Sequence, residues 1–270
     1  MSEMYISGYK KIHKGIILDM IWFGVSIVYF FTSGSIASSG AVKNATILYK
    51  FLLPVSNVFP IIASMLIVDG IFDVESKTIS LKKSMYVFIV RIMLDLMTIL
   101  TTLIVSGETS HLLEMGILDR VTTMISMVLT TINMGIVHYM ALHFLLKDYR
   151  ELVEEYSLDS KIKDKIKSIY KVLIPTAILS FLSLGGYTLI VSIIFTDSDI
   201  STFLSKAVGS ETVSLDVANL PPVLVVIAVG ALMLALIGIA ALILRLICII
   251  GIMNLSKRVI VEMEKKNTDV

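Results

Sequence analysis

Six long apolar blocks constrain this chain more than any other feature. They cover, approximately, residues 15–32, 47–72, 84–105, 119–146, 172–195 and 222–255. A hydrocarbon core about 30 Å thick is crossed by about 20 helical residues. Helices of a soluble core would carry a polar outer face, which these blocks mostly lack. We therefore predict an all-α fold: a polytopic integral membrane helical bundle with six transmembrane helices, forming a single transmembrane domain over residues 1–270.

The composition agrees with this class. The chain is 56% hydrophobic and 17% charged, whereas soluble domains are about 45–50% apolar and about 25% charged. The formal net charge of +1 gives no reason to expect nucleic acid as a partner. With a single cysteine, Cys248, neither an intrachain disulfide nor a cysteine-rich metal site is expected. The first partner to expect is the lipid bilayer.

Positive charge gathers on one side of the predicted bundle. It lies in the N-terminus, the second and fourth connections and the C-terminal tail: Lys10, Lys11, Lys14, Lys77, Lys82, Lys83, Lys147, Arg150, Lys161, Lys163, Lys165, Lys167, Lys171, Lys257, Arg258, Lys265 and Lys266. The opposite side has Lys43, Lys50, Arg120 and Lys206. Because positively charged connections stay in the cytoplasm, we predict cytoplasmic N- and C-termini, in a multi-pass protein of the plasma (cell) membrane.

The connection at 147–171 has a helical pattern of its own. Its apolar residues repeat with the spacing of one helix face: Tyr149, Leu152, Val153 and Tyr156, then Ile162, Ile166, Ile169 and Leu173. We predict a cytoplasmic helical hairpin that continues spans four and five. Two interpretations stay open. The hairpin is either a pair of solvated extensions with snorkelling lysines, or a basic amphipathic surface for anionic lipid or a protein partner.

A polar stripe runs along the third block, through the stretch RIMLDLMTILT at 91–101. At 100° per residue, an arc of about 60° holds every member of the stripe: Ser84, Arg91, Asp95, Thr98 and Thr102. Arg91 and Asp95 stand four residues apart and can pair on their own helix. Since charged residues inside a membrane usually face an interior with a function, we expect both to face a polar interior and not lipid.

The fourth block carries a similar stripe without bases, aligning Ser126, Thr130 and Asn133 with Asp119 and Thr122. Such stripes are either buried helix contacts that allow close packing or parts of a polar route. For the second interpretation the candidate residues of a polar interior or substrate pathway are Arg91, Asp95, Thr98, Thr102, Ser126, Thr130 and Asn133.

A second set of charges lies in the cytoplasmic half of the predicted bundle. Asp19, Asp69 and Arg245 occur at similar depth in blocks one, two and six. We expect a charge network in which Arg245 pairs with Asp19 or Asp69; the alternative is that each side chain snorkels to the interface. Gly238 and Ala241 share the face of Arg245, which predicts a close approach to another helix there.

The sequence gives no sign of a metal, a cofactor or a catalytic residue. His138 and His143 are five residues apart, about 140° around an α-helix, and Asn133 lies about 140° the other way, so the three are not expected to converge. Zinc on a helix favours ligands four residues apart with further ligands nearby. Nucleotide-binding loops and zinc-protease helices are absent from the sequence. We therefore predict that the chain is not an enzyme.

The stretch DVESKTISL, residues 73–81, resembles the acidic-x-x-Thr segment found at this place in ABC-2 type permeases. The six-span layout, with a large outer loop between the last two spans, is similar to that family. The resemblance implies that this segment contacts a cytosolic ATPase subunit. The residues implied in docking are Glu75, Lys77, Thr78 and Leu81.

Three functional hypotheses follow. The first is a transporter component, such as a permease subunit working with a separate cytosolic ATPase or another cytosolic protein. The second is a non-transporting membrane scaffold, assembly or immunity-type protein, in which the Arg91–Asp95 pair is structural. The third is a proton-coupled carrier that uses Asp95. A second copy of the chain, in a homodimer, belongs to the partners considered.

Overall fold

In the computed structural model every described element is a helix. The structure describes the backbone of residues 3–38, 42–74, 77–105, 117–196, 200 and 222–268, and the side chains of 5–25, 58–74, 77–101, 120–196, 200 and 222–268. The elements are α1 (Glu3–Ser38), α2 (Val42–Asp73), α3 (Ile79–Val105), α4 (Ile117–Ile132), the π-helical segment η1 (Asn133–Val137), α5 (His138–Glu155), α6 (Ser160–Thr196) and α8 (Pro222–Thr268).

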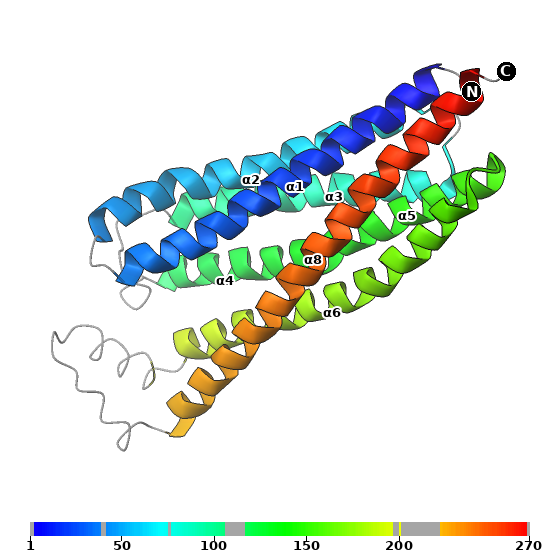
Figure 1. Cartoon of the computed structure of the whole chain (residues 1–270). Coiled ribbons are helices and arrows are strands. Elements are labelled where there is room, and N and C mark those ends of the chain that lie inside the picture. Colours follow the sequence, from blue (N-terminus) through cyan, green and yellow to red (C-terminus); the bar gives the residue numbers. More distant parts are fainter. Residues whose placement is uncertain are drawn as a thin grey trace.

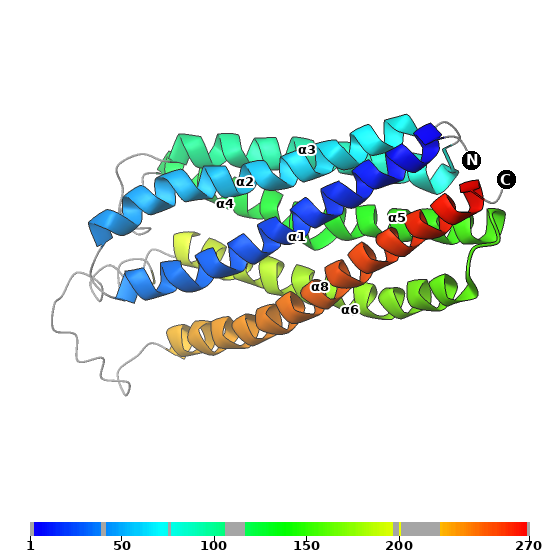
Figure 2. The same ribbon diagram turned by 45° about the horizontal axis from the view of Figure 1, so that its top comes forward.

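The helices form one elongated bundle, with both termini at the same end (Figure 1). Helix α1 packs along α2, and α6 packs along α8. Helix α3 lies against α2, α4 and α5 and so occupies the middle of the arrangement. Figure 2 shows the same bundle from a second direction, with α8 crossing α6 on the near side. The turn between α5 and α6 lies at the end that holds the termini, here called the terminal end.

Four helical stretches of the described chain are long and apolar enough to cross a membrane. They are Ile79–Thr101, Arg120–Glu155, Ser160–Thr196 and Pro222–Thr268. The chain is therefore an all-helical protein of the membrane-spanning type. The predicted blocks 15–32 and 47–72 fall within α1 and α2, where side chains are described only in part. The full set of six spans and the cytoplasmic side of the termini stay predictions.

The surface of the bundle carries large apolar side chains. On α8, Val226 is 70% exposed and Leu232 is 62% exposed. Helix α8 has 47 residues, a length of about 70 Å at 1.5 Å per residue, so it extends well beyond a hydrocarbon core of about 30 Å. Exposed leucines and valines on such a helix are expected where lipid, not water, is the solvent.

The packed core lies towards the terminal end, where helices from both halves of the chain meet. Tyr9 of α1, Tyr149 of α5 and Val259 of α8 are all fully buried in one hydrophobic cluster. The segment 147–171 is the end of α5, a short turn and the start of α6. Its apolar repeat faces this cluster, since Leu152, Ile162, Ile166 and Ile169 are buried there.

Helices α1 and α2 approach each other at glycines. A Cβ atom on Gly8 would lie 2.6 Å from the carbonyl oxygen of Gly70, and one on Gly15 would lie 2.5 Å from Ile67 Cγ1. Distances this short cannot be accommodated without a shift of the helices, so the missing side chains set the spacing of the pair. The predicted close approach at Gly238 is confirmed on the other side of the bundle: a Cβ there would lie 2.8 Å from Ser183 Oγ of α6.

A π-helical turn interrupts the fourth predicted span. Residues Asn133–Val137 form η1 between α4 and α5, and the backbone N–H of His138 donates to the carbonyl of Asn133. This i→i−5 bond accommodates more residues in the turn than an α-helix would. The residues after Asn133 are consequently rotated about the helix axis relative to an unbroken α-helix.

Candidate functional site

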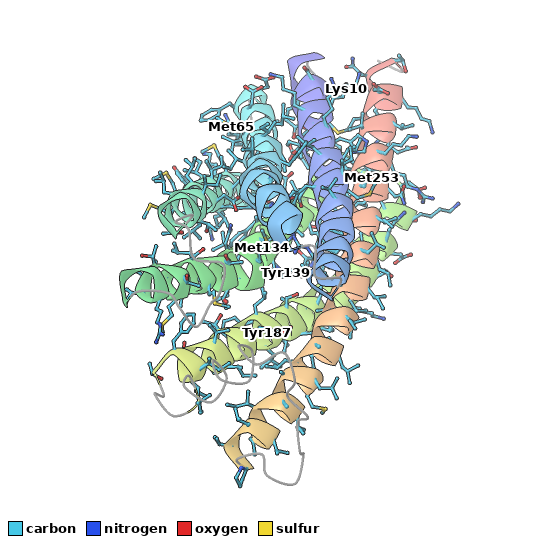
Figure 3. All side chains as sticks on the ribbon, turned by 90° about the vertical axis from the view of Figure 1, so that its left-hand side faces the viewer. Lys10, Met65, Met134, Tyr139, Tyr187 and Met253 are labelled. Carbon is cyan, nitrogen blue, oxygen red and sulfur yellow. The ribbon has the colours of Figure 1, made fainter. Side chains whose placement is uncertain are left out.

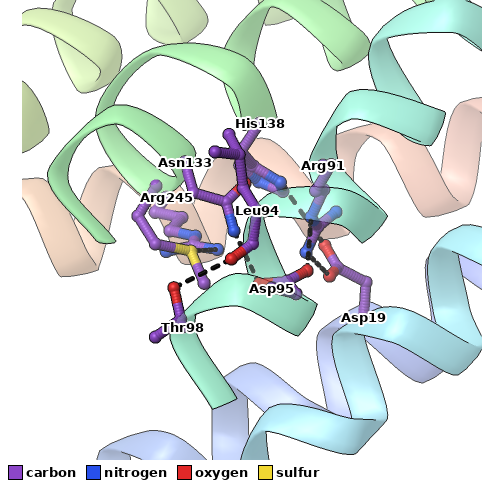
Figure 4. A network of polar contacts seen from close by, with 9 residues as sticks. Asp19, Arg91, Leu94, Asp95, Thr98, Asn133, His138 and Arg245 are labelled. Atoms are coloured by element: carbon purple, nitrogen blue, oxygen red, sulfur yellow. Dashed lines mark hydrogen bonds and ion pairs between the residues drawn. The ribbon is translucent and has the colours of Figure 1, made fainter. Parts of the chain in front are cut away.

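A network of charged and polar side chains lies inside the bundle, drawn from five elements (Figure 4). Its members come from α1, α3, η1, α5 and α8: Asp19, Arg91, Asp95, Asn133, His138 and Arg245. All six are buried. We call this set the intramembrane network, because each member lies within one of the predicted apolar blocks.

Arg91 is the centre of the intramembrane network and has no exposed surface. Its Nη2 donates to Asp19 Oδ1 of α1 at 2.6 Å, while its Nε lies 3.9 Å from Asp95 Oδ2 on its own helix. The predicted pair with Asp95 is therefore present but long, and the close pair joins α1 to α3. Charge-assisted hydrogen bonds of this length are among the strongest in proteins.

Asp95 has a second partner, on the π-helical segment. Asn133 Nδ2 donates to Asp95 Oδ1 at 2.5 Å, and both side chains are buried. Arg91, Asp95 and Asn133, each predicted for a polar interior, thus come together around one point. Helix periodicity predicted that all three face inwards, which the structure agrees with, but it did not predict the contact between Asp95 and Asn133.

His138 also belongs to the intramembrane network, a position that the sequence did not predict. Its Nδ1 lies 4.0 Å from Asp19 Oδ2, and the ring is fully buried. The π-helical turn directly before His138 changes its direction relative to Asn133 from the one expected at 100° per residue. The hydropathy and polar pattern of the sequence does not mark this turn.

The second guanidinium group does not pair as expected. Arg245 lies over the rings of Trp22 and Phe23, 5.5 Å and 4.9 Å from their centroids, and its Nη2 is 3.8 Å from Met134 Sδ. Figure 3 shows Met134 in the interior of the bundle. Asp69 instead pairs with Lys11, at 2.7 Å on the exposed side of α2. The predicted pairing of Arg245 with Asp19 or Asp69 is thus replaced by cation–π contacts. In these contacts the guanidinium group is attracted to the faces of the two aromatic rings.

Several polar atoms of the intramembrane network lack a hydrogen-bond partner among the described residues. They are Arg91 Nε, Asp95 Oδ2, Asn133 Oδ1, both ring nitrogens of His138, and Arg245 Nε. The separation of 3.9 Å between Arg91 Nε and Asp95 Oδ2 is too long for a hydrogen bond. Two guanidinium groups and two carboxylates balance in charge when His138 is neutral. With a neutral His138 the site carries no net charge, and it is rich in hydrogen-bonding capacity that the described residues do not use.

Two further residues predicted for the polar interior, Thr98 and Thr130, bond within their own helices. Thr98 Oγ1 donates to the carbonyl of Leu94, and Thr130 Oγ1 donates to the carbonyl of Ser126. Ser126 and Thr130 are half-buried. The side chain of Thr102 lies outside the described residues.

The segment proposed for docking is partly used inside the chain. Thr78 Oγ1 donates to Asp148 Oδ1 at 2.7 Å and also accepts the backbone N–H of Leu81 at 2.9 Å, so it caps the start of α3. Leu81 is fully buried. Lys77 is half-buried and donates to the carbonyl of Phe72. Glu75 lies outside the described residues. A cytosolic partner at this segment would meet Lys77 and not Leu81.

Comparison with known proteins gives no relative. No family model, curated protein or solved structure matches this chain. Among the described residues, no group of His, Cys, Asp and Glu side chains is arranged to hold a metal ion.

Proposed function

We propose that this protein is the membrane-embedded component of a transporter of the plasma membrane, a permease subunit that works with a separate cytosolic ATPase. The observation that carries the proposal is the intramembrane network: a charge-balanced group of buried side chains with unused hydrogen-bonding atoms. In this proposal Arg91, Asp95 and Asn133 line the polar part of the route.

The energetic cost of the network supports a role beyond packing. One charged residue near the centre of a membrane helix costs about 2.5–3.5 kcal/mol on insertion scales. Each buried polar atom without a partner costs about 1–3 kcal/mol more. Helices that only had to pack could avoid both costs with small or apolar residues. A passing polar substrate, or water that accompanies it, would use these atoms.

The proposed ATPase partner is supported by the resemblance of residues 73–81 to the coupling segment of ABC-2 type permeases. In the described part of the chain this segment is joined to α5, because Thr78 bonds to Asp148 and Ser80 donates to Glu151 Oε1 at 2.6 Å. A movement of this segment on binding the ATPase would therefore also move α5, which carries His138 of the intramembrane network.

Purification of the tagged protein from its native membrane in a mild detergent tests the proposal. Mass spectrometry of the purified material should find an ATPase in stoichiometric amount. Lys77→Glu should reduce the amount of ATPase recovered, while Lys171→Glu, a matched charge reversal on the exposed side of α6, should not. A protein that purifies without any ATPase would contradict the permease form of the proposal.

A non-transporting scaffold, assembly or immunity-type protein is the second candidate. It is favoured by one contact, the 2.6 Å pair between Arg91 and Asp19 that joins α1 to α3. In that case Asp19→Leu with Arg91→Leu would keep the cellular function, because apolar residues can replace a purely structural buried pair. For a transporter the same double variant would fold but lose function. Asp95→Asn would likewise abolish transport at nearly normal expression.

A further inference from the structure

A pocket of about 610 Å³ lies between α6 and α8 near the terminal end of the bundle. Its lining is dominated by positively charged side chains: Lys161, Lys165, Lys257 and Arg258. Asn254 adds an amide, while Ile162 and Val261 add an apolar surface. The intramembrane network contributes no residue to this pocket, which is a separate feature of the molecule.

The two acids of the pocket are already engaged. Asp159 Oδ1 accepts the backbone N–H of Lys161 at the start of α6, and Glu262 Oε1 accepts from Lys265 at 2.8 Å. Within the described residues, no carboxylate pairs with Lys161, Lys165, Lys257 or Arg258. With four bases against two acids in its lining, the pocket carries a net positive charge.

The pocket lies on the terminal side of the apolar blocks. Helices α6 and α8 are in close contact at Gly251 and Ile169, and the pocket residues come before Ile169 on α6 and after Gly251 on α8. Lys257 stands two residues beyond the last apolar block and Lys165 seven residues before the fifth. Positively charged side chains next to apolar segments are placed where lipid headgroups and water meet.

We propose that this pocket binds a phosphate-bearing anion, either the headgroup of an anionic phospholipid or a soluble phosphate compound. A guanidinium group binds two phosphate oxygens at once, and lysines add point charges around it. Basic pockets between membrane helices on the cytoplasmic side are suited to anionic headgroups. The apolar side chains of Ile162 and Val261 would contact the glycerol and upper acyl part of a lipid.

Native mass spectrometry of the full chain, in detergent micelles containing dioleoyl-phosphatidylglycerol or dioleoyl-phosphatidylcholine, tests the proposal. The wild type should retain phosphatidylglycerol and not phosphatidylcholine. Lys165→Gln/Arg258→Gln and, separately, Lys161→Gln/Lys257→Gln should reduce the phosphatidylglycerol adduct at least tenfold. Lys167→Gln/Lys171→Gln removes the same charge from exposed positions on α6 outside the pocket and should leave the adduct unchanged.

Titration with inorganic phosphate in lipid-free detergent separates the two sources of the anion. Phosphate binding that disappears in both pocket variants, without a phosphatidylglycerol adduct in the wild type, would assign the pocket to a soluble phosphate compound. Equal adducts and equal phosphate binding in the wild type and both pocket variants would overturn the proposal. An equal loss of adduct in the Lys167→Gln/Lys171→Gln control would overturn it as well, because general surface charge would then account for the binding.

Discussion

Arg91 of α3 pairs most closely with Asp19 of α1, at 2.6 Å, and only at 3.9 Å with Asp95 on its own helix. The pair is buried on both sides. Removing one member leaves an uncompensated charge in the interior, which typically costs about 3–5 kcal/mol. Loss of the contact between Asp19 of α1 and Arg91 of α3 should therefore destabilise the bundle strongly.

We expect Arg91→Leu and Asp19→Leu each to lower the free energy of unfolding by about 3–5 kcal/mol, and the double variant to recover most of that loss. Unfolding in detergent micelles, followed by circular dichroism, measures all three. Asp69→Leu is the control: its pair with Lys11 is exposed, so its loss should change the stability little. Additive losses in the double variant would show that the two residues do not depend on each other.

His138→Phe should leave the stability unchanged or raise it. Both ring nitrogens are buried without a hydrogen-bond partner in the described structure, so the histidine carries a desolvation cost that phenylalanine does not. The melting temperature of the purified variant checks this. If function is lost while the melting temperature is kept, His138 has a role in function. A decrease of more than about 2 kcal/mol in the free energy of unfolding would mean that the ring nitrogens have hydrogen-bond partners in the membrane.

Gly8→Ala and Gly24→Ala should change stability in opposite directions. Alanine gains up to about 1 kcal/mol over glycine inside a helix. At Gly24 the added Cβ meets no described atom within 4 Å, but at Gly8 it would meet the carbonyl oxygen of Gly70 at 2.6 Å. We expect Gly24→Ala to be stabilising and Gly8→Ala to cost about 1–3 kcal/mol through forced separation of α1 and α2. Thermal unfolding of the two purified variants measures both effects. Equal shifts of the two melting temperatures would argue against a tight crossing of α1 and α2.

Thr78→Val should destabilise the terminal end by about 2 kcal/mol or more, because the hydroxyl both caps α3 and donates to buried Asp148. Thr78→Ser retains the hydroxyl and should stay within about 1 kcal/mol of the wild type. Hydrogen exchange of the first turn of α3 gives a local measurement. If valine protects that turn as well as threonine does, the hydroxyl contributes little.

Residue pattern alone predicted which way many side chains face. The inward direction of Arg91 and Asp95 could be predicted because an α-helix repeats every 3.6 residues, and this repeat depends only on neighbouring residues. The partner of Arg91 could not be predicted in the same way: Asp19 lies 72 residues away. Which helices touch is decided by close approaches such as that of Gly8 to Gly70, and a glycine in a sequence does not identify its neighbour.

Two further features of the intramembrane network escaped the sequence for physical reasons. The π-helical turn at Asn133–Val137 shifts the phase of α5, so angles counted across it are wrong. Arg245 contacts two aromatic rings, whereas a carboxylate partner was expected. A guanidinium group can be satisfied by a carboxylate or by π faces, and the sequence does not favour one over the other.

The ion pair between Lys10 of α1 and Glu264 of α8, at 2.7 Å, has a topological consequence. Two residues in contact cannot lie on opposite sides of a hydrocarbon core about 30 Å thick. We therefore expect the chain to traverse the bilayer an even number of times between Lys10 and Glu264. This expectation does not depend on the distribution of lysine and arginine, and it predicts that tags on the two ends are reached from the same compartment.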